Sequence, residues 1–178
     1  MHRKLAEAIE VDRAVALEGC DDRGEGLAQH ATSLLGVDLT IRDATADDGA
    51  AIASLLGQLG YETEATAVAP RLERLVIVGD RVVVAVTEDE VVGLAHLHAS
   101  PTIEHERPAA KIGALVVDES HRGEGIGRAL VEAMEAEARA RRCVLLFLTT
   151  AERREDAHAF YRRVGLEETG SRFTKTLD

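Results

Sequence analysis

The apolar residues of this chain recur with two periods, one typical of β-strands and one typical of α-helices. Runs that alternate or stay apolar predict strands at 38–42, 81–87, 91–98, 109–117 and 144–149, and short closing strands near 166–168 and 172–177. Apolar stripes spaced by three or four residues predict helices near 52–59 and over 64–75, 126–141 and 155–164. The predicted order is β-α-α-β-β-β-α-β-α-β-β, without an internal repeat.

Residues 1–37 differ in pattern from the rest of the chain, and we expect a helical N-terminal extension before a domain that occupies residues 38–178. Leu5, Ala8 and Ile9 are spaced for a short amphipathic helix, and the apolar residues of 27–35 for a second one. No residues of the extension are arranged for chemistry. Its expected role is therefore packing on the domain or self-association.

A strand, a glycine-rich segment and a helix succeed one another after residue 114. The strand ends with Leu115, Val116 and Val117. The glycine-rich segment then consists of Arg122, Gly123, Glu124, Gly125, Ile126, Gly127 and Arg128. Glycines leave space beside the first amide N–H groups of the helix, which have no partner within it. With the helix dipole and Arg122, these donors predict a phosphate site.

The spacing of the glycines excludes two common phosphate loops. A nucleotide-hydrolase loop ends in Gly-Lys-Ser/Thr, whereas Gly127 is followed by Arg128 and Ala129. A dinucleotide fingerprint has the spacing G-x-G-x-x-G, whereas Gly123, Gly125 and Gly127 are two residues apart. A glycine-rich turn without a ligand stays open as the alternative from this segment alone.

The segment resembles the acetyl-CoA loop of the GCN5-related N-acetyltransferase (GNAT) superfamily, Arg/Gln-x-x-Gly-x-Gly/Ala, which Arg122, Gly125 and Gly127 match. A second segment, 157–166, is similar to the family pattern A-x-x-x-Tyr-x-x-x-Gly-Phe, with Leu166 replacing Phe. More narrowly, the closing segments resemble small-amine acetyltransferases of the aminoalkylphosphonate type. The resemblance covers about 38–178. It implies an α/β (α+β) GNAT fold with a mixed, mostly antiparallel sheet, splayed between its fourth and fifth strands and flanked by helices.

The resemblance also implies roles for individual residues. Acetyl-CoA is the expected cosubstrate, with its pantetheine arm along the backbone of Leu115, Val116 and Val117 and its pyrophosphate on the amides of 123–128. Gly113 is expected to admit the bulge that begins the splay. Tyr161 stands at the position where a family tyrosine faces the thioester sulfur. A phenol of pKa about 10 is protonated at neutral pH, so Tyr161 is the expected general acid, with packing as the alternative role.

No carboxylate marks the general base. Many relatives carry a glutamate on the strand before the loop, whereas residues 111–114 read Lys-Ile-Gly-Ala. His96 and His98 are two apart and share one face of a strand, and His98 is our candidate base or substrate contact. With the Glu-His-Glu segment 104–106, they could instead bind a divalent metal or be ordinary surface groups. We assign no metal site.

Composition and charge limit the partners. The net charge of −11 opposes binding to nucleic acid or to an anionic membrane, because both require basic patches. Cys20 and Cys143 make neither a disulfide framework nor a zinc motif, and no signal peptide or membrane span is recognisable. We expect a cytoplasmic protein with a small-molecule partner. A homodimer formed through the extension and the final hairpin is a further expectation.

The resemblance therefore implies an acetyl-CoA-dependent N-acetyltransferase that moves an acetyl group to a primary amine of a small molecule by direct transfer in a ternary complex. Two alternatives stay open. One is a non-catalytic acyl-CoA-binding sensor or module, which the missing strand glutamate supports. The other is a protein or peptide N-acetyltransferase, since the negative net charge of the chain would attract a cationic acceptor.

Overall fold

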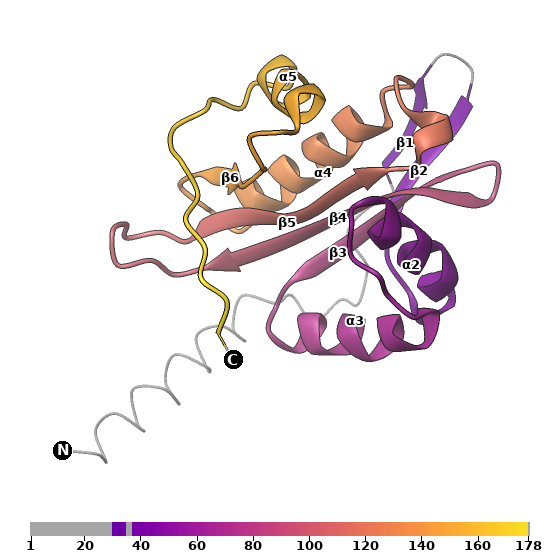
Figure 1. Cartoon of the computed structure of the whole chain (residues 1–178), viewed down its shortest axis with the longest axis horizontal. Helices are drawn as coiled ribbons and strands as arrows, with labels where there is room; N and C mark the ends of the chain where they lie inside the picture. Colours follow the sequence, from indigo (N-terminus) through magenta and orange to yellow (C-terminus); the bar gives the residue numbers. More distant parts are fainter. Residues whose placement is uncertain (1–29, 35–36, 178) are drawn as a thin grey trace.

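A six-stranded sheet forms the centre of the molecule (Figure 1). The computed structural model describes residues 30–34 and 37–177. The strands lie side by side in chain order, as β1 (His30–Leu34), β2 (Val37–Asp43), β3 (Arg81–Thr87), β4 (Glu90–Ser100), β5 (Ala109–Val117) and β6 (Leu146–Leu148). Neighbouring strands are antiparallel except β5 and β6, which are parallel. The predicted mixed, mostly antiparallel sheet is confirmed.

Helices cover both faces of the sheet and bury two separate apolar clusters. They are α2 (Gly49–Gln58), α3 (Val68–Ile77), α4 (Ile126–Ala140) and α5 (Glu155–Arg163). On one face, Ile52 and Leu55 of α2 pack with Leu94 of β4. On the other face, Leu130 and Met134 of α4 belong to the larger cluster. The helices α2 and α3 therefore lie opposite α4 across the sheet, as Figure 1 shows.

Three predicted elements are wrong, one helix and two strands. The expected helical face over 27–35 is interrupted by β1, which pairs with β2. The reason is that the edge of β2 offers backbone partners, which outweigh a weak helical pattern. Residues 166–177 form neither of the expected closing strands, and β6 offers an edge of only three residues. The helix predicted around Leu5, Ala8 and Ile9 lies outside the described residues.

The strands β5 and β6 separate after three residue pairs. Ala110 lies opposite Leu146 and Ile112 lies opposite Leu148, where the pairing ends. Beyond this point, residues 114–117 of β5 pair only with β4 among the described strands. This is the splay predicted between the fourth and fifth strands, which become β5 and β6 once β1 is counted.

Gly113 is an extra residue in β5. Leu97 of β4 lies opposite Ile112, whereas His96 lies opposite Ala114, so Gly113 has no counterpart on β4. Such a bulge bends its strand and increases the local twist. The bulge predicted at Gly113 is therefore present, and it lies where β5 leaves β6.

A buried ionic network ties the turn before β3 to the last part of α4. Glu137 of α4 is 6% exposed, and it accepts hydrogen bonds from Arg81 of β3 and from Arg141, both at 2.6 Å. Arg81 also pairs with Asp43 of β2, and Arg141 donates to the carbonyl of Gly79. Burial by itself would raise the pKa of Glu137, but the guanidinium groups of Arg141 and Arg81 outweigh it and hold that pKa below its ordinary value.

Replacing Glu137 with Gln should lower the free energy of unfolding by about 2 kcal/mol at pH 7, because two charge-assisted hydrogen bonds lose their charged acceptor. Since the pKa of Glu137 is depressed by folding, its stabilisation is present above the unfolded pKa and disappears as the pH falls through the lower folded value. The difference between wild type and Glu137→Gln should therefore narrow in acid. Urea denaturation at neutral and at acidic pH measures both effects.

Glu135→Gln is the matched control. Glu135 pairs with Arg139 on the exposed side of the same helix, and such a pair contributes about 0.3–0.5 kcal/mol. If the two variants lost the same free energy of unfolding, the larger contribution assigned to the buried Glu137 would be contradicted.

Candidate functional site

The glycine-rich segment forms a loop that ends at the first residue of α4. Gly123 and Gly125 have φ values of +93° and +85°, which residues with a side chain adopt only at a cost. Gly125 is the N-cap of α4, and no side chain caps this helix. The amides from Ile126 to Arg128 have no acceptor within the helix. The loop therefore combines free backbone donors with the positive end of a helix dipole, the two features that an anion site requires.

A side chain of α2 fixes the segment that leads into this loop. Gln58 donates from Nε2 to Oδ2 of Asp118 at 2.8 Å and accepts at Oε1 from the amide of Glu119 at 3.0 Å. The Ser120 hydroxyl, followed by Gln58, holds the pKa of Asp118 well below its ordinary value. The sequence did not reveal this role of Gln58, because its partner lies 60 residues further along the chain.

Tyr161 lies on α5, a helix that packs against the start of α4. Its neighbour Phe160 has its ring centroid 5.4 Å from that of Tyr161. A Cβ atom at Gly127 would lie 3.2 Å from Cζ of Phe160, so a side chain there would press on this ring. Burial raises the pKa of Tyr161, and Arg154 opposes the rise only in part. The phenol is therefore protonated at neutral pH.

The two histidines of β4 meet at a buried carboxylate that the sequence did not reveal. Asp80 follows α3, and its side chain is 5% exposed. Its Oδ2 lies 2.8 Å from Nε2 of His96, and its Oδ1 lies 2.5 Å from Nδ1 of His98. Because a carboxylate only accepts hydrogen bonds, each imidazole donates one N–H to Asp80. No pattern around Asp80 in the chain marks this contact, which only the packing of the α3–β3 turn creates.

The other residues weighed for a metal site lie apart from Asp80. The segment 104–106 is exposed in the loop between β4 and β5. Within 30–34 and 37–177, no group of three or more His, Cys, Asp or Glu side chains is arranged to hold a metal ion. None of the helices in this part of the chain is long and apolar enough to cross a bilayer.

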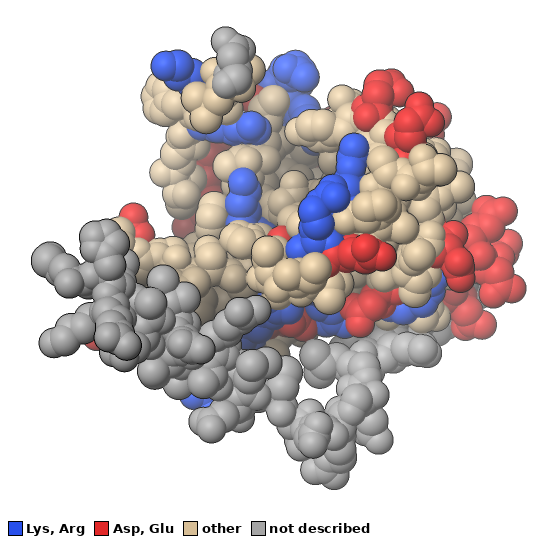
Figure 2. All heavy atoms as spheres, turned by 90° about the horizontal axis from the view of Figure 1, so that it is seen from below, with Lys and Arg blue, Asp and Glu red and all other residues tan. Residues whose placement is uncertain are grey.

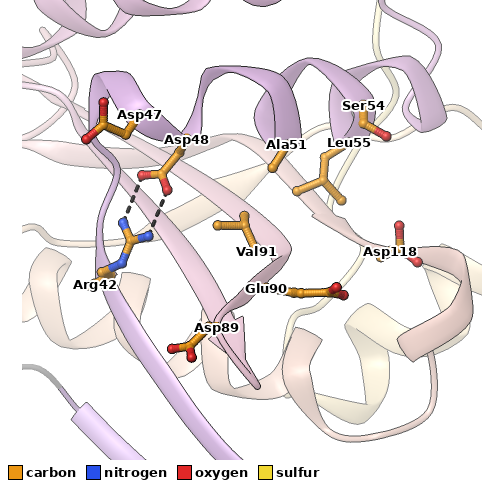
Figure 3. A pocket seen from close by; sticks show the side chains of 10 residues that line it. All are labelled: Arg42, Asp47, Asp48, Ala51, Ser54, Leu55, Asp89, Glu90, Val91 and Asp118. Atoms are coloured by element: carbon orange, nitrogen blue, oxygen red, sulfur yellow. Dashed lines mark hydrogen bonds and ion pairs between the residues drawn. The ribbon is translucent and has the colours of Figure 1, made fainter.

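A cavity of about 470 Å³ opens beside α2 (Figure 3). Five carboxylates and one arginine dominate its lining, which consists of Arg42, Asp47, Asp48, Ala51, Ser54, Leu55, Asp89, Glu90, Val91 and Asp118. Arg42 binds Asp48 through two hydrogen bonds of 2.8 and 2.7 Å, which raise the pKa of Arg42 and lower that of Asp48. Neither Tyr161 nor His98 lines this cavity.

Acidic side chains also lie close together toward one edge of the face shown in Figure 2.

Comparison with known sequences places the chain among acetyltransferases. The model of the acetyltransferase (GNAT) family matches residues 50–166. The chain is 40% identical over 93 residues to an aminoalkylphosphonate N-acetyltransferase of Salmonella typhimurium. The aligned part is 52% of this chain and spans 60% of the length of that relative.

Solved structures share the fold. An acetyltransferase of Trypanosoma brucei has a TM-score of 0.69 and 25% identity, over 79% of this chain and 100% of that one. An aminoglycoside N-acetyltransferase in complex with CoA has a TM-score of 0.70, over 80% of this chain and 96% of that one. The identity to the aminoglycoside N-acetyltransferase is 16%, so this comparison supports a shared fold and not a shared substrate. The family match covers most of the described domain, and the parted strands and uncapped loop agree with it. The chain belongs to the acetyltransferase (GNAT) family.

Proposed function

We propose that this protein transfers the acetyl group of acetyl-CoA to a primary amine of a small molecule, directly within a ternary complex. The observation that carries the proposal is the contact between Phe160 and Gly127, which joins the helix of Tyr161 to the anion-binding loop. A protonated phenol beside a loop for phosphates suits a reaction in which a thiolate leaves from a phosphate-bearing carrier.

The residues present fit acetyl-CoA as the cosubstrate. The uncapped amides of 123–128, with Arg122 beside them, would hold its pyrophosphate. On the side away from β4, the backbone of Leu115, Val116 and Val117 has no strand partner in the described part of the chain, and it would pair with the pantetheine arm. Acetyl-CoA supplies the acetyl group as a thioester, which an amine nitrogen can attack.

A small amine is the acceptor class that the relatives support. The Salmonella typhimurium relative is named for aminoalkylphosphonates, and the chain shares 40% identity with its aligned part. Thiol release should be followed with small primary amines, including aminoalkylphosphonates, and the products identified by mass spectrometry. Turnover on a small amine is the expected result.

A non-catalytic acyl-CoA-binding module is the second candidate function, because residues 111–114 of β5 contain no carboxylate. This alternative requires calorimetric binding of acetyl-CoA without thiol release on any acceptor. Turnover restricted to peptides would instead point to a protein or peptide N-acetyltransferase. Either result would contradict the small-amine proposal.

In the proposed reaction, holding the amine beside the thioester supplies a large part of the acceleration, on the order of 7–11 kcal/mol for well-oriented reactants. Tyr161 acts as the general acid and gives its proton to the sulfur of the leaving thiolate. His98 either contacts the acceptor amine or takes its proton. Its ring is 44% exposed and is held at Nδ1 by Asp80, so Nε2 is available to the acceptor.

Tyr161→Phe should lower kcat by roughly 100-fold, the usual scale for loss of a general acid, with the affinity for acetyl-CoA unchanged. The substitution removes the hydroxyl and keeps the ring that packs beside Phe160. Steady-state kinetics with the amine identified above measures the effect. Tyr161→Leu is the companion variant. If Phe retained full activity and Leu did not, the role of Tyr161 would be packing.

Gly125→Ala should weaken CoA binding about 10-fold, because a residue with a Cβ at φ +85° costs about 1–2 kcal/mol. The strain distorts the amides that precede α4. Isothermal titration with CoA gives the affinity. Gly57→Ala is the control, since residue 57 is helical and a Cβ there would meet nothing within 4 Å. Identical affinities for the two variants would contradict the assignment of the loop.

A further inference from the structure

Three lysine or arginine side chains lie on the described strands, and two of them bind buried carboxylates. Arg42 of β2 pairs with Asp48, and Arg81 of β3 pairs with Glu137. The third is Lys111 of β5, which takes part in none of the ion pairs within 30–34 and 37–177. This part of the chain therefore places a cation at Lys111 without an anion to match it.

Lys111 lies between His98 and Phe147 on one face of the sheet. His98 of β4 is its partner on one side, and Phe147 of β6 is its partner on the other. Residues directly opposite one another on neighbouring strands project from the same face of a sheet. Leu146 and Leu148, the neighbours of Phe147, pack against the cluster on the α4 side. The row formed by His98, Lys111 and Phe147 therefore projects to the other side, that of α2 and α3.

This row is accessible to a ligand. On the same face, α2 packs over Leu94 and Val116, a pair of residues nearer the other end of β5. Phe147 is 41% exposed, and the imidazole of His98 is 44% exposed. The row therefore offers a ligand a cation, an imidazole and the surface of an aromatic ring.

The row lies where the proposed function brings the acceptor. In that proposal the pyrophosphate of acetyl-CoA lies at 123–128 and the pantetheine arm runs along 115–117, so the acetyl end points toward Gly113. Lys111 is two residues before Gly113, which is about 7 Å along a strand. The loop end of β5 is about 20 Å from Lys111, out of reach of phosphates held at the loop. An anion for Lys111 therefore has to come from the acceptor.

We infer that Lys111 binds an anionic group of the acceptor, which is thus a short primary amine that carries a phosphonate, phosphate or carboxylate. This inference rests on the proposed function and names the class of amine. A lysine ammonium donates charge-assisted hydrogen bonds to such oxygens. Neighbouring strands lie about 5 Å apart, so His98 and Lys111 suit an amine and an anion at the two ends of a short carbon chain. Phe147 supplies an apolar surface for that chain.

Four amines of similar length test the class. 2-Aminoethylphosphonate and β-alanine carry an anion, propylamine carries none, and 1,3-diaminopropane carries a second cation. The wild type should acetylate at least one of the anionic amines with a kcat/KM about 10-fold or more above that of propylamine, the scale of a charge-assisted hydrogen bond. The faster of the two identifies the anion as phosphonate or carboxylate. A wild type that prefers propylamine or 1,3-diaminopropane would overturn the inference.

Lys111→Met should raise KM for the preferred anionic amine about 10- to 100-fold and leave kcat/KM for propylamine unchanged. Lys111→Arg keeps the charge and should retain part of the preference, whereas Lys111→Glu should turn it toward 1,3-diaminopropane. The control is Arg139→Met, which removes one positive charge from the exposed side of α4, across the sheet. It should change neither value.

An equal loss with charged and uncharged amines in Lys111→Met would overturn the inference, because a merely structural lysine would act in this way. An unchanged KM for the anionic amines would overturn it too. Thermal melts identify a variant that has lost its fold. Lys111→Gln, which keeps a polar side chain, then gives the same comparison.

Anion binding is also tested without turnover. Ethylphosphonate and propionate lack the amine and are not acetylated. Calorimetric titration of each into the wild-type protein with CoA, at constant ionic strength, should show binding of at least one, which Lys111→Met loses. Equal binding by the two proteins, or none by the wild type, would overturn the inference. Binding that depends on Lys111 without acetylation of any amine would instead refute the proposed function and support the anion site.

Discussion

The extra residue at Gly113 is the constraint on which the rest of the site depends. A bulge lengthens β5 without lengthening β4, and it lies just beyond Ile112, the last residue of β5 that pairs with β6. From there on, one edge of β5 is available to a ligand. Because this residue lacks a side chain, the ring of His96 can lie on it. A single position therefore governs both the separation of the strands and the placement of an imidazole.

The helix α4 supports the site at both of its ends. Its uncapped N-terminus faces the glycine loop, where Gly127 also admits the ring of Phe160. Near its C-terminus, Glu137 forms ion pairs with the guanidinium groups of Arg81 and Arg141. The guanidinium of Arg141 also donates a hydrogen bond to the carbonyl of the residue before Asp80. The glycine-rich loop and the carboxylate of Asp80 are thus held by one helix, although they lie at its opposite ends.

Local donors, rather than net charge, would decide whether this acidic chain binds an anion. A net charge of −11 repels anions at long range. Dissolved salt screens this repulsion over about 10 Å, whereas backbone amides that contact a phosphate attract it directly. The acidic cavity beside α2 illustrates the same point. The carboxylate of Asp48 there is neutralised by Arg42, and that of Asp118 is held by Gln58 and Ser120, so both serve the fold.

The sequence alone determined most of the elements, the glycine-rich loop and the family, because these depend on local periodicity and on residues close together in the chain, such as Gly125 and Gly127. It also located the bulge at Gly113. It did not reveal β1, which exists through pairing with β2, nor the role of Asp80, which meets the histidines of β4 only when the α3–β3 turn packs beside that strand. Strand partners and buried polar contacts join residues far apart in the chain, so the tertiary structure alone decides them.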